Sequence, residues 1–248
     1  MNLTFQQLET LMRTEENARD GELPTAPYII ARLDGRGFSR LTGRLFEKPF
    51  DEAFHLLMME TMRHLMNIEA ELAFAYNQSD EISLLMLPGS APFNRKARKL
   101  LSLLPAAASA RLSLLLGEPV CFDCRLNLQT EPLGVHRYFR WRSIDAERNA
   151  FNACAYWLLR KQGTAPETAA EKLRLLTAAE QRKLLADNGI DFDSIPGWQR
   201  RGSCLYRTQE TRCGFNPLTG EQTTYTRRKL LEEDFTDANL SSVLGMEI

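Results

Sequence analysis

Three acidic residues are the clearest candidates for chemistry in this sequence, because each stands where a predicted strand begins or ends. Asp80 and Glu81 are adjacent in the stretch AYNQSDEISLLML, and apolar residues alternate on both sides of them, at 72–76 and 82–86. Asp34 follows another apolar run, PYIIARL. A solvated turn would also accept Asp80 and Glu81, since Asp and Ser side chains hydrogen-bond the local backbone. A site and a turn are therefore both open at this point.

Convergence of these acids would favour a metal site. In a split βαβ sheet, the strand that ends at Asp34 lies beside the strand that begins near Asp80. Carboxylates that meet in this way raise each other's pKa, and a divalent cation removes the repulsion. Oxygen ligands without histidine favour Mg²⁺, and two ions roughly 3.5–4 Å apart form the clamp of nucleotidyl transfer. Gly35 would let a backbone carbonyl approach the metal, although Asp-Gly is also an ordinary turn dipeptide.

Basic residues near predicted helix starts suggest a phosphate-bearing ligand. Lys48 directly precedes Pro49, which suits a first helical turn. A second cluster heads a later helix and comprises Arg95, Lys96, Arg98 and Lys99. Helix N-termini bind phosphate, so both groups could hold a triphosphate; a solvated charged face is the alternative.

The elements that must position these residues follow from hydrophobic periodicity. In the first half, strands and helices are predicted in the order strand, helix, strand, strand, helix, strand, at 28–34, 48–67, 72–76, 82–86, 94–117 and 119–128. Pro105 should kink or interrupt the second of these helices. This order predicts an α+β fold with a ferredoxin-like palm, a split βαβ antiparallel sheet with helices on one face.

The second half is predicted to be mostly helical. One or two helices end at Gly163, another covers 165–176, and a third begins with a capping box from Thr177 to Glu180 and stops at Gly189. A loop then returns the chain to the main body. We therefore divide the chain into a palm-like core with an amphipathic N-terminal helix (1–131) and a helical annex with its return segment, packed on that core (132–248).

Composition narrows the class of protein. The 248 residues are 44% apolar, enough for a sizeable core, and the net charge of −1 does not by itself indicate a nucleic-acid binder. Five cysteines, an odd number, favour a reducing compartment. Cys121 and Cys124 lack further zinc ligands at suitable spacing and are expected to be core residues on a strand. The sequence shows no signal core and no stretch of transmembrane length, so we expect a cytoplasmic protein without membrane contact.

An ordered set of short motifs resembles the tRNA-His guanylyltransferase family, including its bacterial and archaeal branch of 3′-to-5′ polymerases. The motifs are RLDGRGF, FEKPFDEAFHLLM, AYNQSDEISLLM, FDCRLNL, RYFRWRSIDAERNAFNACAYWLL and GSCLYR. They run in order from about Pro27 to Arg207, and it is their order that makes the resemblance specific.

The resemblance implies an enzyme that extends tRNA at its 5′ end. A 5′-monophosphate is activated with ATP or GTP, the 3′-hydroxyl of an incoming nucleoside triphosphate, GTP for tRNA-His, attacks it, and the product's 5′-triphosphate is trimmed. Asp34, Asp80 and the Gly35 carbonyl would bind two Mg²⁺ ions, with Glu81 as a third catalytic acid. Phe38 would lie near the base, and Lys99 would handle triphosphate. The implied nucleotide-binding residues are Arg36, Gly37, Phe38, Ser39, Lys48, Ser79, Lys99 and Asn149.

Departures from the family pattern point to one branch. Eukaryotic members carry a histidine where this chain has Ser39, and an HINN motif where it has the residues ERNA at 147–150. Another family asparagine is replaced by Ala153. These residues belong to members that add one untemplated guanosine to tRNA-His. Their absence favours templated addition and repair of 5′-truncated tRNAs, with guanosine addition to tRNA-His retained.

Arginines interleaved with aromatic residues in HRYFRWR suggest RNA contacts, because arginines neutralise phosphates and aromatic rings stack on bases. Phe139 and Trp141 cannot share a helix face, so at least one should pack in the core. A further basic cluster lies at 227–229, and the family implies a homotetramer across which the tRNA is bound. The predicted RNA-binding residues are Arg137, Arg140, Arg142, Arg200 and Arg201.

Two other functions stay open. A palm-fold enzyme similar to nucleotide cyclases would act on a free triphosphate, and the helical half with its arginines disfavours it. A catalytically inactive tRNA-binding protein would gain nothing from three acids that repel a polyanion.

Overall fold

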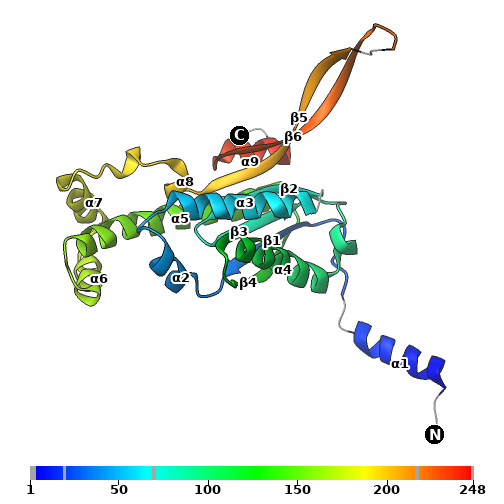
Figure 1. Ribbon diagram of the computed structural model, residues 1–248, viewed down its shortest axis with the longest axis horizontal. Helices are drawn as coiled ribbons and strands as arrows, with labels where there is room; N and C mark the ends of the chain where they lie inside the picture. Colours follow the sequence, from blue (N-terminus) through cyan, green and yellow to red (C-terminus); the bar gives the residue numbers. More distant parts are fainter. Residues whose placement is uncertain (1–3, 19–20, 69–70, 216–217, 247–248) are drawn as a thin grey trace.

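A computed structural model describes residues 4–18, 21–68, 71–215 and 218–246. The parts of the predicted N-terminal helix at 1–3 and 19–20 lie outside these residues. One antiparallel sheet forms the centre, with the strand order β4-β1-β3-β2-β5-β6 (Figure 1). Its strands are β1 (Tyr28–Gly35), β2 (Leu72–Gln78), β3 (Glu81–Met86), β4 (Phe122–Gln129), β5 (Ser203–Phe215) and β6 (Gln222–Asp234).

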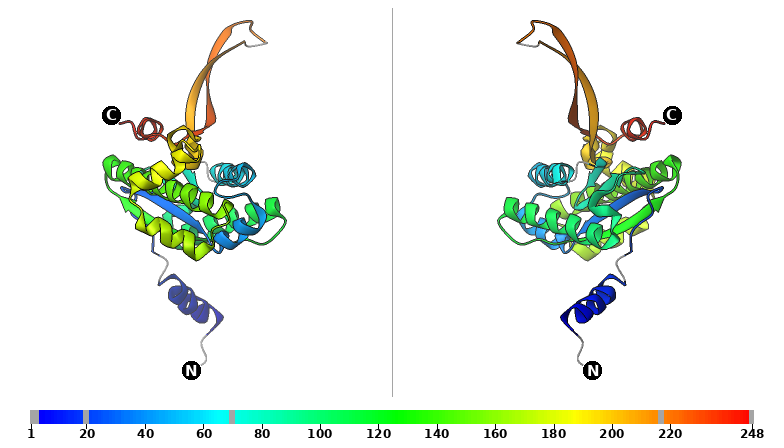
Figure 2. Two further views of the ribbon diagram at one scale, coloured as in Figure 1. Left: turned by 90° about the vertical axis from the view of Figure 1, so that its left-hand side faces the viewer. Right: turned by 90° about the vertical axis from the view of Figure 1, so that its right-hand side faces the viewer.

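Helices cover both faces of the sheet (Figure 2). The α-helices are α1 (Phe5–Asn17), α2 (Phe38–Leu45), α3 (Glu52–Ile68), α4 (Ala97–Leu116), α5 (Pro132–Lys161), α6 (Pro166–Leu175), α7 (Ala178–Asp187), α8 (Gly197–Arg200) and α9 (Asp237–Leu244). Two short 3₁₀ turns are η1 (Pro92–Arg95) and η2 (Phe192–Ser194).

The predicted palm is confirmed. The first four strands lie in the order β4-β1-β3-β2, and the two connecting helices α3 and α4 pack on the same face. Alternation along β1 explains this, because Ile29 and Leu33 point to the α3–α4 side while Ile30 points to the other. The second face is covered by α5 and α9 from the second half of the chain, with Phe139 buried against the sheet.

Helix α4 differs from its prediction in two respects. It continues through Pro105 without interruption, and Pro105 is buried within it. It is also long and apolar enough to cross a membrane by length and composition alone, contrary to the expectation that no such stretch exists. Length and composition do not distinguish a membrane span from a core helix, and α4 packs through Leu100, Leu104 and Leu112 in the core beneath the sheet.

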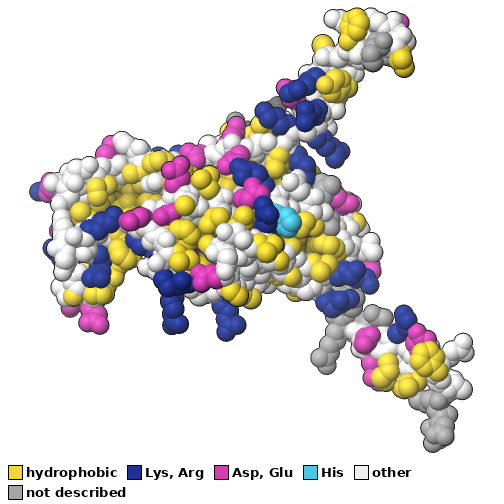
Figure 3. Space-filling view, in the orientation of Figure 1, with side chains coloured by type: hydrophobic (Ala, Val, Ile, Leu, Met, Phe, Trp, Pro, Cys, Tyr) yellow, Lys and Arg dark blue, Asp and Glu magenta, His cyan; other side chains and the backbone are white. Residues whose placement is uncertain are grey.

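The second half contributes more than helices. After α5, α6, α7 and α8, strand β5 pairs with β2, and β6 pairs with β5 over its full length. The outer part of this hairpin projects from the body, with basic side chains gathered close to the body (Figures 1 and 3). This hairpin was not predicted from the sequence, because its outer part is largely exposed and lacks the alternation that burial on one face produces.

Several local predictions are confirmed. Thr177 and Glu180 form the capping box of α7, and Gly189 beyond the end of that helix has a positive φ of 76°. Phe139 is buried and Trp141 is exposed, so the two rings do separate as expected. The cysteine prediction is wrong for Cys121, which is exposed and precedes β4. Cys124 is half-buried within β4, and burial raises the pKa of its thiol to about 12.

Candidate active site

The acids lie at a rigid two-residue turn. Strands β2 and β3 pair Gln78 with Glu81, which leaves Ser79 and Asp80 as the loop. Ser79 has a positive φ of 52°, a conformation that few residues other than glycine adopt. The buried Asn77 amide donates to the backbone oxygens of Ser79 and Glu81, both at 3.0 Å. These bonds hold the turn and therefore the direction of the Asp80 carboxylate.

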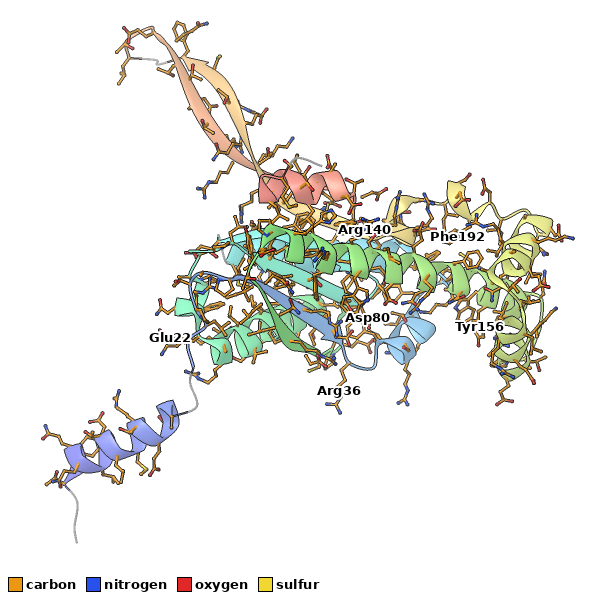
Figure 4. The ribbon with its side chains drawn as sticks, turned by 180° about the vertical axis from the view of Figure 1, so that it is seen from behind. Glu22, Arg36, Asp80, Arg140, Tyr156 and Phe192 are labelled. Atoms are coloured by element: carbon orange, nitrogen blue, oxygen red, sulfur yellow. The ribbon has the colours of Figure 1, made fainter. Side chains whose placement is uncertain are left out.

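Sheet pairing brings the third acid to the same place. Antiparallel pairing of β1 with β3 sets Asp34 directly opposite Glu81, as the split βαβ order predicts. Asp34, Asp80 and Glu81 line one cavity of about 340 Å³, together with Lys48 and Asn149. Figure 4 shows Asp80 beneath α5 at the end of the sheet near α2, with Glu22 far away at the opposite end.

Burial dominates the electrostatics of this cavity. It raises the pKa of the Asp80 carboxyl, and the negative charge of Asp34 adds to the rise. It also lowers the pKa of the Lys48 ammonium, against the opposing pull of Asp80 and Asp51. Lys48 donates to the Thr42 hydroxyl at 2.6 Å. Two partly buried carboxylates repel each other, and one lysine is near them. A bound cation would reduce this repulsion and stabilise the site.

Glu81 is already neutralised by arginine. Arg142 on α5 donates to both of its carboxylate oxygens, at 2.7 and 2.9 Å, and Arg32 lies 3.8 Å away. Burial raises the pKa of Glu81, and Arg142 acts against that rise. Arg142 also approaches Asp145 at 3.5 Å. From the sequence we predicted that Arg142 contacts RNA; in the structure its guanidinium instead pairs with Glu81 in the cavity.

Because Glu81 is paired with Arg142, Asp34 and Asp80 are the predicted carboxylates left to bind a metal, and their oxygen atoms suit Mg²⁺. Within the described parts of the chain, no three His, Cys, Asp or Glu side chains are grouped to hold a metal. Asp34 and Asp80 do share the cavity, and Gly35 directly follows Asp34 at the end of β1. Mg²⁺ typically takes one or two carboxylates and completes its shell with substrate phosphates and water. Asp34 and Asp80 therefore fit a site that a nucleotide would complete, whereas Gly35 is not among the residues that line the cavity.

The glycine-rich segment after β1 serves packing. A Cβ on Gly35 would lie 2.5 Å from the Phe38 ring, so only glycine fits there. Gly37 begins α2 with a φ of 76°. The Phe38 ring is buried against Phe54 and Phe122, with centroids at 6.3 and 5.1 Å, rather than free to stack near a base as expected. Gly35 and Phe38 therefore contribute to the packing that holds the turn between β1 and α2.

The remaining predicted nucleotide-binding residues divide into two groups. Ser79 and Asn149 line the cavity, and Asn149 donates to Asp145 at 3.4 Å. Ser39 is exposed on α2, and the Arg36 side chain points away from the body (Figure 4). Neither of these two lines the cavity.

The basic cluster at the start of α4 lies far from the acids. Helix α4 ends where β4 begins, and β4 begins opposite Gly35 at the acidic end of the sheet. The twenty residues of α4 therefore place its start, with Lys99, at the other end. Arg95 there is buried and donates to the backbone oxygens of Ser90 and Pro27, both at 2.8 Å. Within one chain, this cluster therefore does not meet Asp34, Asp80 or Glu81.

The predicted RNA-binding arginines also separate. Arg137 and Arg140 are exposed on α5, and Arg140 is labelled in Figure 4. Arg201 is exposed directly after α8. Arg200 is largely buried, lies 3.8 Å from both Glu147 and Asp193, and stacks over Phe192. Its observed contacts are structural.

Several cavity residues were not predicted from the sequence, among them Thr42, Asp51, His55 and Trp198. Asp51 had a detectable signal, because it stands just before α3 as a helix cap does. Its carboxylate accepts from the backbone N–H groups of Glu47 and Phe54, at 2.9 and 3.0 Å. His55 and Trp198 had no such signal, since helices from opposite halves of the chain bring them together.

Comparison with known proteins agrees with this fold. A family model described as tRNAHis guanylyltransferase matches residues 9–130, and one described as Thg1 C terminal domain matches residues 134–240. A probable tRNA(His) guanylyltransferase from Drosophila melanogaster is 30% identical over 199 residues, covering 76% of this chain and 69% of that protein. A tRNA(His) guanylyltransferase from Neurospora crassa is 30% identical over 205 residues, covering 77% and 70%.

Solved structures of tRNA(His) guanylyltransferases and related proteins also resemble this chain. A bacterial tRNA(His) guanylyltransferase-like protein in complex with ATP has a TM-score of 0.71 and 27% identity, covering 80% of this chain and 88% of that one. Another such complex, with GTP, has a TM-score of 0.66 and 25% identity, covering 90% of each chain. The Saccharomyces cerevisiae enzyme, at 23% identity and a TM-score of 0.71, supports the fold, covering 78% and 91%. The chain belongs to the tRNA(His) guanylyltransferase family of enzymes.

Proposed function

We propose that this protein transfers guanosine monophosphate from GTP to the 5′ end of tRNA, with tRNA-His as the preferred substrate. The observation that carries the proposal is the cavity in which Asp34 and Asp80 converge beside Lys48. Its volume of about 340 Å³ falls in the range of small-molecule sites. Relatives bear the name of this activity, and the two bacterial structures were determined with ATP and with GTP.

The reaction runs in the 3′-to-5′ direction. The 5′-monophosphate of the tRNA first attacks the α-phosphate of ATP or GTP, which forms a phosphoanhydride and releases pyrophosphate. The 3′-hydroxyl of the incoming GTP then attacks the activated 5′-phosphate, and the nucleoside monophosphate leaves. Water then hydrolyses the bond between the α- and β-phosphates of the new 5′-triphosphate, which releases pyrophosphate and leaves a 5′-monophosphate.

Residues of this chain supply positioning and charge. Two Mg²⁺ ions, when bound, would activate the attacking oxygen and neutralise the leaving group. Asp34 and Asp80, with the Gly35 carbonyl, would hold the ions. Lys48 would contact phosphate oxygens from the cavity wall, and Arg142 keeps the Glu81 carboxylate fixed beside them.

We further propose templated addition and repair of 5′-truncated tRNAs. The support is the departure from the untemplated pattern at three positions on or beside the cavity. Ala153 lines the cavity, Ala150 lines it and is buried, and Arg148 pairs with Asp145 at 2.7 Å. Each of these side chains differs from the family residue at its position.

A primer-extension assay tests the function. We would use a tRNA-His transcript that lacks its first nucleotide and carries a 5′-monophosphate, and follow labelled GTP incorporation with Mg²⁺ and ATP. Two substrates would differ only in the opposing base, C or A. Addition opposite C alone supports templated repair, and addition opposite both supports a guanylyltransferase that does not need a template. No addition to either, by folded protein that binds the tRNA, would contradict the proposed function.

We propose that the exposed side of α5 is part of the RNA-binding surface. Arg137, Arg140 and Trp141 are exposed on consecutive turns, directly beside the cavity residue Arg142. Within the described residues, neither Arg137 nor Arg140 makes an ion pair or a side-chain hydrogen bond with the protein. Both charges are therefore available for phosphates. A homotetramer, if it forms, would extend this surface across subunits.

Removing these two charges should weaken tRNA binding without changing nucleotide binding. For Arg137→Gln with Arg140→Gln, the slope of log Kd against log salt should fall by about one for each phosphate that the protein no longer neutralises. Filter binding at several salt concentrations measures this. Arg44→Gln is the matched control, because Glu118 already neutralises Arg44 at 2.6 and 2.7 Å. An unchanged slope in the double variant would place the RNA elsewhere.

A further inference from the structure

An aromatic residue stands outside the cavity on helix α5. Trp141 is 52% exposed and does not line the cavity. Two neighbours contact its ring. Tyr138, one turn earlier, meets it edge-on with ring centroids 5.8 Å apart, and the guanidinium carbon of Arg142 lies 4.6 Å from its centroid. Edge-to-face and cation–π contacts of this kind favour one ring orientation. Trp141 is therefore an exposed ring in a defined position.

Arg142 links this ring to the acids. The same guanidinium donates to both carboxylate oxygens of Glu81, at 2.7 and 2.9 Å. Glu81 directly follows Asp80 at the turn between β2 and β3. A group that stacks on Trp141 is thus held in a fixed position relative to Asp80, while it stays outside the cavity.

Two arginines lie side by side on the face of the sheet that α5 crosses (Figure 4). Arg32 on β1 is 3.8 Å from Glu81, and the residue opposite it in register on β4 is Arg125. Directly opposite residues of an antiparallel pair point to the same face, so Arg125 also faces the α5 side. Like charges in this arrangement repel each other. A bound anion would remove that repulsion.

The charge of Arg125 is available for such an anion. The Arg32 side chain is only 17% exposed and lies beside Glu81, whereas Arg125 is exposed on the edge strand of the sheet. Among the residues that the structure describes, the Arg125 guanidinium makes no ion pair and no hydrogen bond. Arg125 therefore combines an exposed position with an unpaired charge.

Tyr138 connects Trp141 to this pair of arginines. It is half-buried and packs against the core beneath α5. Burial raises the pKa of its hydroxyl, and the charges of Glu81, Arg32 and Arg142 all act on that group. The side of α5 that carries Tyr138 and Trp141 therefore faces the part of the sheet where the two arginines lie. An aromatic ring and a free positive charge thus flank one surface next to the acids.

Single-stranded RNA fits this surface better than a duplex does. Bases inside a duplex already stack on their neighbours, whereas an unpaired base can stack on an aromatic side chain. The 3′ strand of a tRNA continues as a single strand beyond the terminal base pair, so it supplies unpaired bases close to the 5′ end. One exposed ring and one unpaired arginine match the base and the phosphate of such a strand.

We propose that Trp141 and Arg125 bind the single-stranded 3′ end of the tRNA, opposite the 5′ end that reacts in the cavity. Trp141 stacks on one unpaired base, and Arg125 neutralises a phosphate of the same strand. The inference rests on the proposed function, because it assigns the strand that lies opposite the reacting 5′ end. Trp141 and Arg125 are positioning residues that hold the end of the tRNA against the acids, and they take no part in phosphoryl transfer.

Binding to short hairpin RNAs tests the site. We would compare two hairpins with the same duplex and the same 5′-monophosphate, one blunt and one with an unpaired 3′ extension. Trp141→Leu should weaken binding of the extended hairpin about ten-fold, the loss expected when one base stack is removed, and should leave the blunt hairpin unchanged. Arg125→Gln should lower the slope of log Kd against log salt by about 0.7 for the extended hairpin alone.

Abasic nucleotides separate base stacking from a structural effect of the substitution. At one position of the extension, removing the base should weaken wild-type binding as much as Trp141→Leu does, and should have no further effect on Trp141→Leu. In transfer assays, Trp141→Leu should raise the KM for the extended hairpin and leave GTP affinity unchanged.

Two further variants complete the series. Trp157→Leu is the matched control, because Trp157 lies on the same helix, packs against Tyr156 and does not line the cavity. It should bind both hairpins as wild type does. Trp141→Phe serves if Trp141→Leu does not fold, since it keeps a ring, and its affinity for the extended hairpin should lie between those of wild type and the abasic complex.

The outcomes separate the two proposals. Wild-type protein that binds neither hairpin and transfers no nucleotide would contradict the proposed function itself. Wild-type protein that binds and extends both hairpins equally well would overturn the 3′-strand site alone. Equal losses of affinity for the blunt and the extended hairpin in Trp141→Leu and Arg125→Gln would also overturn it, because these residues would then contact the duplex or support the fold. The same holds if the abasic site weakens wild type and Trp141→Leu equally.

Discussion

Asp80→Asn should lower the rate of nucleotidyl transfer by roughly 10³-fold, about 4 kcal/mol at the transition state, while leaving the fold intact. Asparagine is isosteric and keeps the turn, but it removes one of the two carboxylates that share the cavity. Single-turnover assays with activated tRNA measure the effect. Asp123→Asn is the matched control, because Asp123 pairs with Asp34 across β1 and β4 yet is exposed and outside the cavity.

When no metal is bound, Asp80→Asn should leave the folded protein at least as stable as wild type, although it lowers the reaction rate. Burial and the charge of Asp34 raise the pKa of Asp80 in the folded protein. The unfolded chain therefore loses its proton first as pH rises, and the folded state loses stability between the unfolded and the folded pKa. At neutral pH and without Mg²⁺, Asp80→Asn should have a Tm at or above that of wild type, and this difference should disappear in acid.

Added Mg²⁺ completes this test. It should raise the Tm of wild type and of Asp123→Asn, because it binds only the folded carboxylates, and should raise that of Asp80→Asn much less. Equal metal stabilisation of all three proteins would show that Asp80 is not a ligand. Full transfer activity of Asp80→Asn would contradict the assignment of the active site.

Arg142→Met should destabilise the protein by about 3 kcal/mol or more, the largest stability effect that we expect from one charged residue. The side chains of Arg142 and Glu81 are only 14% and 13% exposed, and Arg142 grips both carboxylate oxygens. Removing one partner of a buried pair leaves a desolvated charge, which costs about 3–5 kcal/mol. Arg32 lies too far away, at 3.8 Å, to replace the two short bonds.

Urea unfolding of three variants checks this explanation. Arg148→Gln is the control, because Arg148 pairs with Asp145 from a position that is 71% exposed, and such pairs contribute about 1 kcal/mol or less. Adding Glu81→Gln to Arg142→Met should recover most of the lost stability, since no buried charge is left, while transfer activity stays low. An Arg142→Met protein as stable as Arg148→Gln would show that water or another group already neutralises Glu81.

Local sequence pattern was enough to predict the palm and the main acids. Alternating apolar residues define the strands, and the order of strands and helices in the first half permits few sheet topologies. Once the split βαβ order is known, Asp34 must lie beside the hairpin turn that contains Asp80, as the register of β1 with β3 confirms. These features depend on residues that are close in sequence or lie in one sheet. The hydrophobic periodicity of the sequence is therefore enough to predict them.

Local sequence pattern did not predict the roles of residues that depend on contacts between distant segments. The sequence placed Arg142 with the RNA-binding arginines, and only the packing of α5 across the sheet directs it to Glu81. Phe38 looked like a ring beside a base, yet the absence of a Cβ at Gly35 lets it pack into the core. Lys99 resembled a triphosphate contact, and the length of α4 carries it to the far end of the sheet.

The sequence by itself thus predicted that the three acids converge and which fold presents them. Tertiary structure alone decided the partners of those residues, because a charge or a ring can be satisfied by any segment that reaches it. It brought His55 and Trp198 together from helices more than a hundred residues apart and completed the cavity with them. Long-range packing of this kind leaves no periodic signal in the sequence that a local pattern could reveal.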